Sequence, residues 1–185
     1  MRKMIVLILV ILVLGIAPVT AGGTAAKSSN PLVARLSSLN GQAFDVAFTQ
    51  ALIPIDEEAV EMAMTATLYA DHSTLLRWNQ DFVERKNKEI RKMLSLLQSM
   101  GSRPSERRAG VATAHVKKLR TLRGAALEKT YLPLLASQLD QSASLEHLAT
   151  SKASRSEVRD FAKQSVRMDG QESTTLRSWL KQWYK

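Results

Sequence analysis

The sequence contains no cysteine in its 185 residues. This absence excludes disulfide bonds, thiolate metal ligands, cysteine nucleophiles and covalently attached c-type haem. The chain is 45% hydrophobic and is long enough to form a globular core. The fold must therefore be stabilised by packing alone.

Several catalytic patterns are also missing. The chain has no glycine-rich phosphate loop and no nucleophile elbow, and no serine has a histidine or an acid at a meaningful spacing. We therefore expect no enzymatic activity and assign no catalytic residue. A resident cofactor is not expected either, with a divalent metal or copper as the alternative discussed below.

Positive charge is absent from one long stretch. No Lys or Arg occurs from Leu36 to Leu76, whereas the following residues are rich in both, and the whole chain carries a formal charge of +9. One interpretation is an acidic helix packed antiparallel to a basic one. The alternative is a dedicated binding surface for an anionic partner.

The N-terminus has the pattern of an export signal. MRKMIVLILVILVLGIAPVTAGG has two basic residues, an apolar run and small residues at Val19 and Ala21, which predicts cleavage after Ala21. An uncleaved membrane anchor is the alternative, and the lack of cysteine excludes a lipoprotein. We expect a periplasmic or secreted protein with no membrane span after cleavage. Its partner would be an envelope protein or an anionic polymer rather than nucleic acid.

The remainder of the chain contains an internal repeat of one unit. VARLSSLNGQAF, from Val33, aligns with VKKLRTLRGAAL, from Val116, and the offset of 83 residues continues without a gap to the end. Apolar residues match apolar residues along it, as in these pairs: Phe48 with Tyr131, Trp78 with Phe161, Val83 with Val166 and Leu97 with Leu180.

Apolar residues recur at spacings of three and four in the first unit, from Phe48 to Tyr69 and from Leu75 to Met100. The second unit repeats this pattern at 127–149 and 158–183. The pattern predicts a short helical lead-in followed by two long helices. The predicted fold is all-α, a duplicated up-and-down four-helix bundle. The expected segments are a signal peptide (1–21), a flexible mature N-terminus (22–32), a first repeat (33–102), a basic connection (103–115) and a second repeat (116–185).

FDVAFTQALIPIDEEAVEMA, followed by KNKEIRKM, resembles the ferritin-like domain of unknown function 305 family, whose pattern runs FDxxFxxxMIPHHxxAxxMA and then QxxEIxxM. TYLPLLASQLDQSASLEHLA is similar to a more diverged copy. The resemblance implies an envelope protein whose paired histidines bind copper or another metal. It also implies a bend at Pro54, after which Glu57 and Glu58 would lie near a fresh helix start.

This chain departs from that pattern at the ligand positions. The histidine pair corresponds to Ile55 and Asp56 in the first copy and to Gln138 and Leu139 in the second. The family glutamine corresponds to Lys86 and Asp169, and the glutamate is kept as Glu89 and Glu172. Every imidazole of the implied site is lost.

Two hypotheses remain for these polar positions. Lys86 is one helical turn from Glu89, which predicts a buried ion pair where the family has a metal. The alternative is a rebuilt oxygen site for a hard cation, made of Asp56, Gln138, Glu89, Asp169 and Glu172. Metal binding requires these carboxylates to converge without the Lys86 ammonium among them.

Other candidates are weaker. Met62 and Met93 offer thioether sulfur to Cu(I), although methionine at helical spacing more often fills a core. His72, His115 and His147 have no mutual helical spacing suited to a metal and are expected at the surface or at helix caps. A basic patch between the repeats would dock anionic surfaces; its residues are Arg107, Arg108, Lys117, Lys118 and Arg120.

The sequence thus predicts an exported, non-enzymatic bundle with a degenerate metal site and a binding or structural role in the envelope. A metal-handling protein with a rebuilt carboxylate site is the alternative, and a docking module for anionic surfaces is the weaker alternative.

Overall fold

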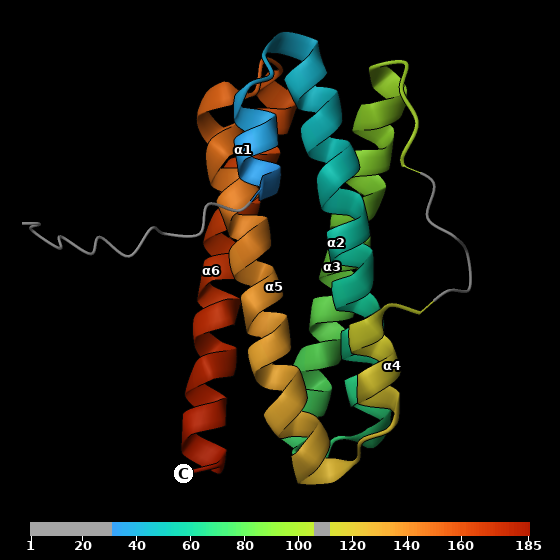
Figure 1. Ribbon diagram of the computed structural model, residues 1–185, viewed down its shortest axis with the longest axis vertical. Helices are drawn as coiled ribbons and strands as arrows, with labels where there is room; N and C mark the ends of the chain where they lie inside the picture. Colours follow the sequence, from blue (N-terminus) through green and yellow to red (C-terminus); the bar gives the residue numbers. More distant parts are fainter. Residues whose placement is uncertain (1–30, 106–111) are drawn as a thin grey trace, which may run out of the picture.

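The computed structural model describes residues 31–105 and 112–185, which form six α-helices and no strand (Figure 1). The all-α helical bundle is therefore confirmed. The signal segment, residues 22–30 and two of the basic-patch residues, Arg107 and Arg108, lie outside the described residues. The helices are α1 (Pro31–Ser37), α2 (Gly41–Tyr69), α3 (Ser73–Ser99), α4 (Ala114–Arg120), α5 (Gly124–Lys152) and α6 (Ser156–Trp183).

The two halves have the same order of helices. α4, α5 and α6 begin 83 residues after α1, α2 and α3, which is the offset of the sequence repeat. Gly41 and Gly124, at the starts of α2 and α5, both have positive φ, 59° and 50°, which glycine adopts at little cost. The short helices begin two residues before the expected repeat boundaries at 33 and 116. A duplication remains the interpretation of this pattern, and the ferritin-like label stays a prediction.

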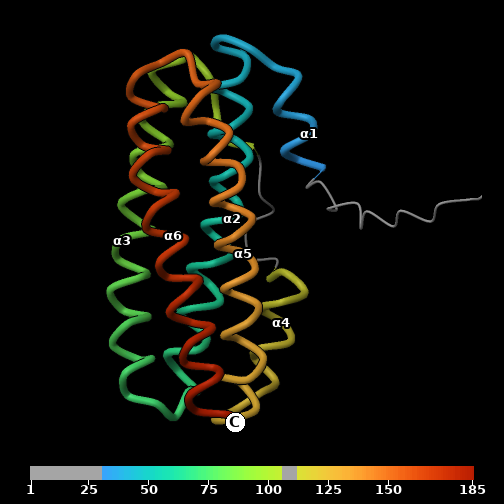
Figure 2. The backbone as a smooth tube through the Cα atoms, turned by 90° about the vertical axis from the view of Figure 1, so that its left-hand side faces the viewer, coloured from blue at the N-terminus to red at the C-terminus, as the bar shows by residue number. Residues whose placement is uncertain are grey.

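Four long helices form the bundle, and the two short ones cover one side of it. α2 packs on α3, α5 packs on α6, and α2 also packs against α5. Both α1 and α4 contact α2 and α5, and Figure 2 shows them on the same side of the bundle, one toward each end. That leaves α3 and α6 on the opposite side.

Proline does not interrupt α2, so no new helix begins after Pro54. α2 continues through Pro54, and α5 likewise contains Pro133. The expectation that Glu57 and Glu58 lie near a fresh helix start is therefore wrong, since both lie within a continuous helix. Packing on α3 and α5 supports the helix across the backbone hydrogen bond that proline removes.

The helix ends follow local rules. α3 ends at Ser99, and Gly101 follows it with a φ of 68°, while the amides of Gly101 and Ser102 donate to the carbonyls of Gln98 and Leu97 at 3.0 and 2.9 Å. The side chain of Thr113 caps α4 by accepting from the Val116 amide at 3.3 Å.

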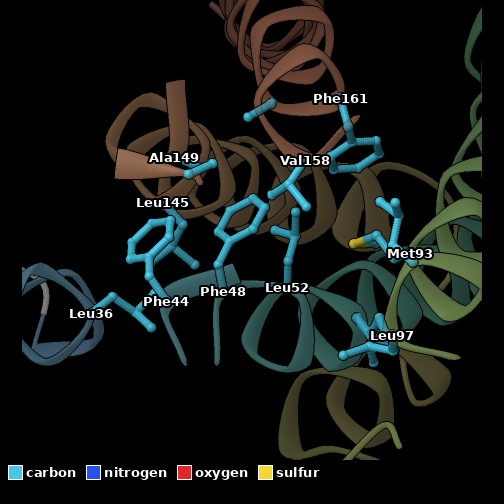
Figure 3. Packing of buried hydrophobic residues seen from close by; sticks show 14 of the residues in the cluster. Leu36, Phe44, Phe48, Leu52, Met93, Leu97, Leu145, Ala149, Val158 and Phe161 are labelled. Carbon is cyan, nitrogen blue, oxygen red and sulfur yellow. The ribbon is translucent and has the colours of Figure 1, made fainter. Parts of the chain in front are cut away.

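The core is apolar at both ends and polar at its middle. One cluster contains Phe44, Phe48, Met93 and Phe161 (Figure 3), and the second, toward the other end, contains Tyr131 and its neighbours. The long helices change from one cluster to the other at buried polar residues: Asp56 on α2, Lys86 on α3, Ser142 and Glu146 on α5, and Ser165, Asp169 and Ser173 on α6.

Two buried carboxylates hold the halves together at the bundle ends. Asp45 accepts hydrogen bonds from the amides of Ser154 and Arg155, both at 2.9 Å, at the start of α6. Glu128 lies 83 residues after Asp45 and accepts from the amides of Asp71 and His72, at 2.7 and 2.9 Å, at the start of α3. Each half therefore caps a helix of the other half, where negative charge is also favoured by the helix dipole.

Replacing either carboxylate should destabilise the bundle strongly. Asp45→Ala and Glu128→Ala each leave two amides at a helix start without their acceptor, and we expect each to lower the free energy of unfolding by about 2–4 kcal/mol. Urea unfolding followed by circular dichroism measures this effect. Glu84→Ala removes an exposed carboxylate of α3 and serves as the control with little expected change. Equal stability of all three variants and the parent would contradict the capping role.

Candidate functional site

The polar layer in the middle of the bundle is centred on one lysine. Lys86 is completely buried, and its Nζ lies 3.1 Å from Asp56 Oδ1, 3.1 Å from Glu89 Oε2 and 2.9 Å from Asp169 Oδ1. The three carboxylates come from α2, α3 and α6, so one ammonium joins three of the four long helices. The metal hypothesis requires the space between these carboxylates to be free of the Lys86 ammonium, but the ammonium lies there.

Residues at equivalent positions of the two halves meet in this layer. Lys86 and Asp169 are 83 residues apart and form a hydrogen bond of 3.0 Å. Ile55 and Gln138 are also 83 apart, and the Gln138 side-chain amide donates to the Ile55 carbonyl at 2.6 Å. A twofold relation between the halves produces such contacts, because residues beside the axis face their own equivalents.

Arg85 bridges the third equivalent pair, Glu89 and Glu172. Its guanidinium donates to Glu89 Oε1 at 2.7 Å and also to Glu172. Arg85 Nη1 lies 4.0 Å from Asp169 Oδ1 as well. The two glutamates therefore face an arginine, and only Glu89 of the pair also contacts Lys86.

A further acid, Glu146 on α5, belongs to this layer and was not predicted. Its carboxyl group is completely buried and has no hydrogen-bond partner among the described residues. It interacts electrostatically with Asp169, Lys86, Asp56 and Glu89. We call the seven ionisable residues the mid-bundle cluster: Asp56, Arg85, Lys86, Glu89, Glu146, Asp169 and Glu172.

Burial governs the protonation of the cluster. It raises the pKa of Glu146 to about 10, reinforced by Asp169, and the pKa of Asp56 to about 7 against the opposing effect of Lys86. The pKa values of Asp169 and Glu172 are raised for the same reason. Burial alone would lower the pKa of Lys86, but the surrounding carboxylates outweigh it and raise that pKa well above 10.5. The cluster therefore keeps its ammonium charged and holds protons on some of its acids.

The two methionine candidates lie in the apolar core. Met62 and Met93 are both fully buried, in the second and first apolar clusters respectively. Figure 3 shows Met93 among the apolar side chains at its end of the bundle. Their surroundings are those of core-filling residues.

The histidines lie apart from the mid-bundle cluster. His72 precedes α3, stacks on Trp183 with ring centroids 4.0 Å apart, and its Nδ1 lies 2.5 Å from Glu128 Oε2. His115 Nδ1 lies 3.0 Å from Glu58 Oε1, and His147 is exposed on α5. Across residues 31–105 and 112–185, no group of three or more His, Asp or Glu side chains is arranged to hold a metal ion.

The described members of the basic patch are on α4. Lys117, Lys118 and Arg120 are exposed there. The helix α4 that carries them packs against α2 and α5 on one side of the bundle (Figure 2).

The first half of the chain matches a known family model. The model of the domain of unknown function 305, DUF305, matches residues 18–97. This stretch of the chain is similar to the DUF305 family. The match spans α1, α2 and nearly all of α3, whereas the second half of the chain lies beyond it. A comparison with curated proteins finds no significant match.

Solved structures share the fold. A Cu(I)-bound structure of CopM has a TM-score of 0.68 at 18% identity and covers 76% of this chain and 98% of its own. A DUF305 fragment from Deinococcus radiodurans has a TM-score of 0.67 at 20% identity, with coverages of 75% and 95%. A DUF305 protein from Streptomyces coelicolor, described as secreted, has the same TM-score and identity, with coverages of 75% and 91%.

The DUF305 ligand positions of this chain do not fit the metal site that the family pattern implies. Ile55 and Leu139 carry no donor atom on their side chains, and Gln138 uses its amide nitrogen on the Ile55 carbonyl. Asp56, the remaining position, faces the Lys86 ammonium. A protonated lysine is a donor only and repels a second cation at this distance.

The raised pKa values predict that stability falls as pH rises. Between its unfolded pKa of 4.5 and its folded pKa of about 10, Glu146 is protonated only in the folded state, and Asp56 behaves likewise between 3.8 and about 7. For each proton that only the folded state binds, the free energy of unfolding falls by about 1.4 kcal/mol per unit rise in pH. Thermal melting from pH 5 to pH 8 should show the decrease.

Glu146→Gln separates this effect from other titrations, because it keeps the shape and removes the ionisable group. We expect the variant to lose less stability than the parent over the same pH range. Glu128 and Asp140, whose pKa values are lowered, titrate below this range and do not contribute. A parent protein that gains stability toward pH 8 would contradict the assignment.

Removing the central ammonium should be costly. Lys86→Met leaves buried carboxylates without their cation, and we expect the free energy of unfolding at neutral pH to fall by about 3–5 kcal/mol. Lower pH should restore part of it, since the carboxylates then bind protons. Chemical unfolding of Lys86→Met and of the exposed control Lys88→Met tests this, and equal effects of the two substitutions would overturn the central role of Lys86.

Proposed function

We propose that this protein is an exported, non-catalytic bundle of the cell envelope that binds a partner or serves as a structural element without a resident metal. The observation that carries the proposal is the position of the Lys86 Nζ, 2.9–3.1 Å from three carboxylates on three helices. The chain supplies from its own sequence the positive charge that this layer needs.

The energetics favour an internal cation. The carboxylates of Asp56 and Asp169 are buried and costly without a counter-charge, and an ammonium in contact with both offsets this cost. A metal ion would have to displace a side chain whose pKa is raised well above its ordinary value by those same carboxylates. Displacement of Lys86 by a metal ion would also break the three contacts of its ammonium with the carboxylates of the bundle.

Export is supported by two observations. The N-terminal segment has the pattern of a signal peptide, and the similar Streptomyces coelicolor protein is described as secreted. Within residues 31–105 and 112–185, none of the helices is both long and apolar enough to cross a membrane.

The absence of catalysis is supported by how the polar groups are used. Lys86, Arg85 and their carboxylates bind one another between helices, and His72 is engaged by Glu128 and Trp183 at the end of the bundle. These groups serve to join helices, which suits a binding or structural protein.

Metal content decides the proposal. The purified protein, equilibrated in turn with copper, zinc, iron and manganese and then dialysed, should retain no stoichiometric metal and show no rise in melting temperature. Lys86→Ala is the matched variant, because it opens the space between the carboxylates, and divalent ions should raise its melting temperature. Stoichiometric retention by the parent, lost in Glu89→Ala, would overturn the proposal.

Metal handling is the second candidate, and one feature of the cluster favours it. Five carboxyl groups, those of Asp56, Glu89, Glu146, Asp169 and Glu172, surround two cations, and Glu146 has no hydrogen-bond partner among the described residues. CopM structures of the same fold carry copper or silver. A metal bound beside Glu146 would be released by Glu146→Gln, whereas the primary proposal expects no metal in either protein.

A further inference from the structure

Two exposed apolar side chains lie on α2 next to the basic helix α4. Leu68 and Met64 are 72% and 54% exposed, and Leu94, on α3, is the remaining exposed large hydrophobic residue among the described residues. Met64 and Leu68 are four residues apart, so they lie on one face of α2, one turn from each other. Exposed apolar groups of this size at one place favour a surface that binds something apolar.

A groove joins these apolar residues to positive charge. It has a volume of about 280 Å³, and its lining includes Met64, Leu68, Tyr69 and Arg120, with Glu61 as the acidic member. The Arg123 guanidinium lies 3.6 Å from the centre of the Tyr69 ring. An aromatic ring, two aliphatic side chains and arginines therefore share one surface.

The basic side of this surface extends along α4. Lys117 and Lys118 are exposed on the same short helix as Arg120, while Val116 and Leu119 are buried and fix α4 on the bundle. The cations are thus held on a packed helix beside the apolar pair. We call Met64, Leu68, Lys117, Lys118, Arg120 and Arg123 the α2–α4 surface.

We infer that the α2–α4 surface docks on an anionic lipid bilayer. Lysines and arginines are attracted to anionic head groups, while leucine, methionine and tyrosine gain free energy by entering the boundary between head groups and acyl chains. A soluble anionic polymer would satisfy the cations but leave Leu68 and Met64 in water. The combination of both residue types therefore points to a lipid surface, and this binding is independent of whether the mid-bundle cluster holds a metal.

Vesicle sedimentation tests the inference. The chain from residue 22, which retains all six described helices, would be mixed with phosphatidylcholine vesicles and with vesicles that also contain phosphatidylglycerol. We expect binding to the anionic vesicles only, weakened by salt. Equal binding to both kinds of vesicle, or to neither, would overturn the proposal.

Two sets of variants separate the contributions. Joint replacement of Lys117, Lys118 and Arg120 by Gln should weaken binding on the order of a hundredfold, and Leu68→Ser with Met64→Ser should weaken it roughly tenfold. The controls are joint replacement of Lys88, Lys163 and Lys181 by Gln, which removes the same charge elsewhere, and Leu94→Ser. Thermal melting confirms that each variant is folded.

The pattern of losses decides between lipid and other partners. Loss of vesicle binding with the α4 variant but not with the serine variant would mean that the surface binds anionic groups without inserting Leu68 and Met64 into the bilayer, as it would bind an anionic polymer, and would overturn the inference. A similar loss in the charge-matched control would mean that net charge alone causes binding, which also contradicts it.

Discussion

The burial of the Lys86 ammonium is the constraint on which the arrangement of the bundle depends. A charged group without access to water is tolerated only when carboxylates reach it, and these come from α2, α3 and α6 at 2.9–3.1 Å. The apolar clusters at the two ends bury the helices against one another without directional bonds, so they restrain the relative rotation of the helices less sharply than ion pairs do. The ion pairs in the middle layer fix that rotation, because a shift would leave a buried charge unpaired.

Polar contacts between the two halves also occur at the ends of the bundle. Asp45 caps α6 and Glu128 caps α3, so each half completes a helix start that belongs to the other. Together with the Lys86–Asp169 and Ile55–Gln138 contacts, these bonds join the halves at three levels along the bundle. These buried polar groups therefore connect the two halves of the bundle.

The long helices and their pairing could be predicted because apolar spacing and the 83-residue offset are local features of the sequence. Lys86 and Glu89 could be paired for the same reason, since they lie one turn apart. The participation of Glu146 in the mid-bundle cluster could not be predicted. Its equivalent in the first half is Ala63, and its burial depends on how α5 is rotated in the bundle. Asp45 and Glu128 could have been noticed, because an acid occupies the equivalent position in both repeats. The helix starts that they cap could not, because they are distant in the sequence: Asp45 binds the Ser154 amide, 109 residues away, and Glu128 binds the Asp71 amide, 57 residues away. The helix start expected after Pro54 was wrong, because local rules favour an interruption at proline, whereas α2 continues through Pro54 and packs on α3 and α5.

The most direct test of the central claim is a crystal structure of the protein grown with copper or zinc and recorded at the absorption edge of the metal. The account predicts density for the Lys86 side chain between Asp56, Glu89 and Asp169 and no anomalous peak there. An anomalous peak among these three carboxylates, with the lysine turned out of the layer, would contradict it.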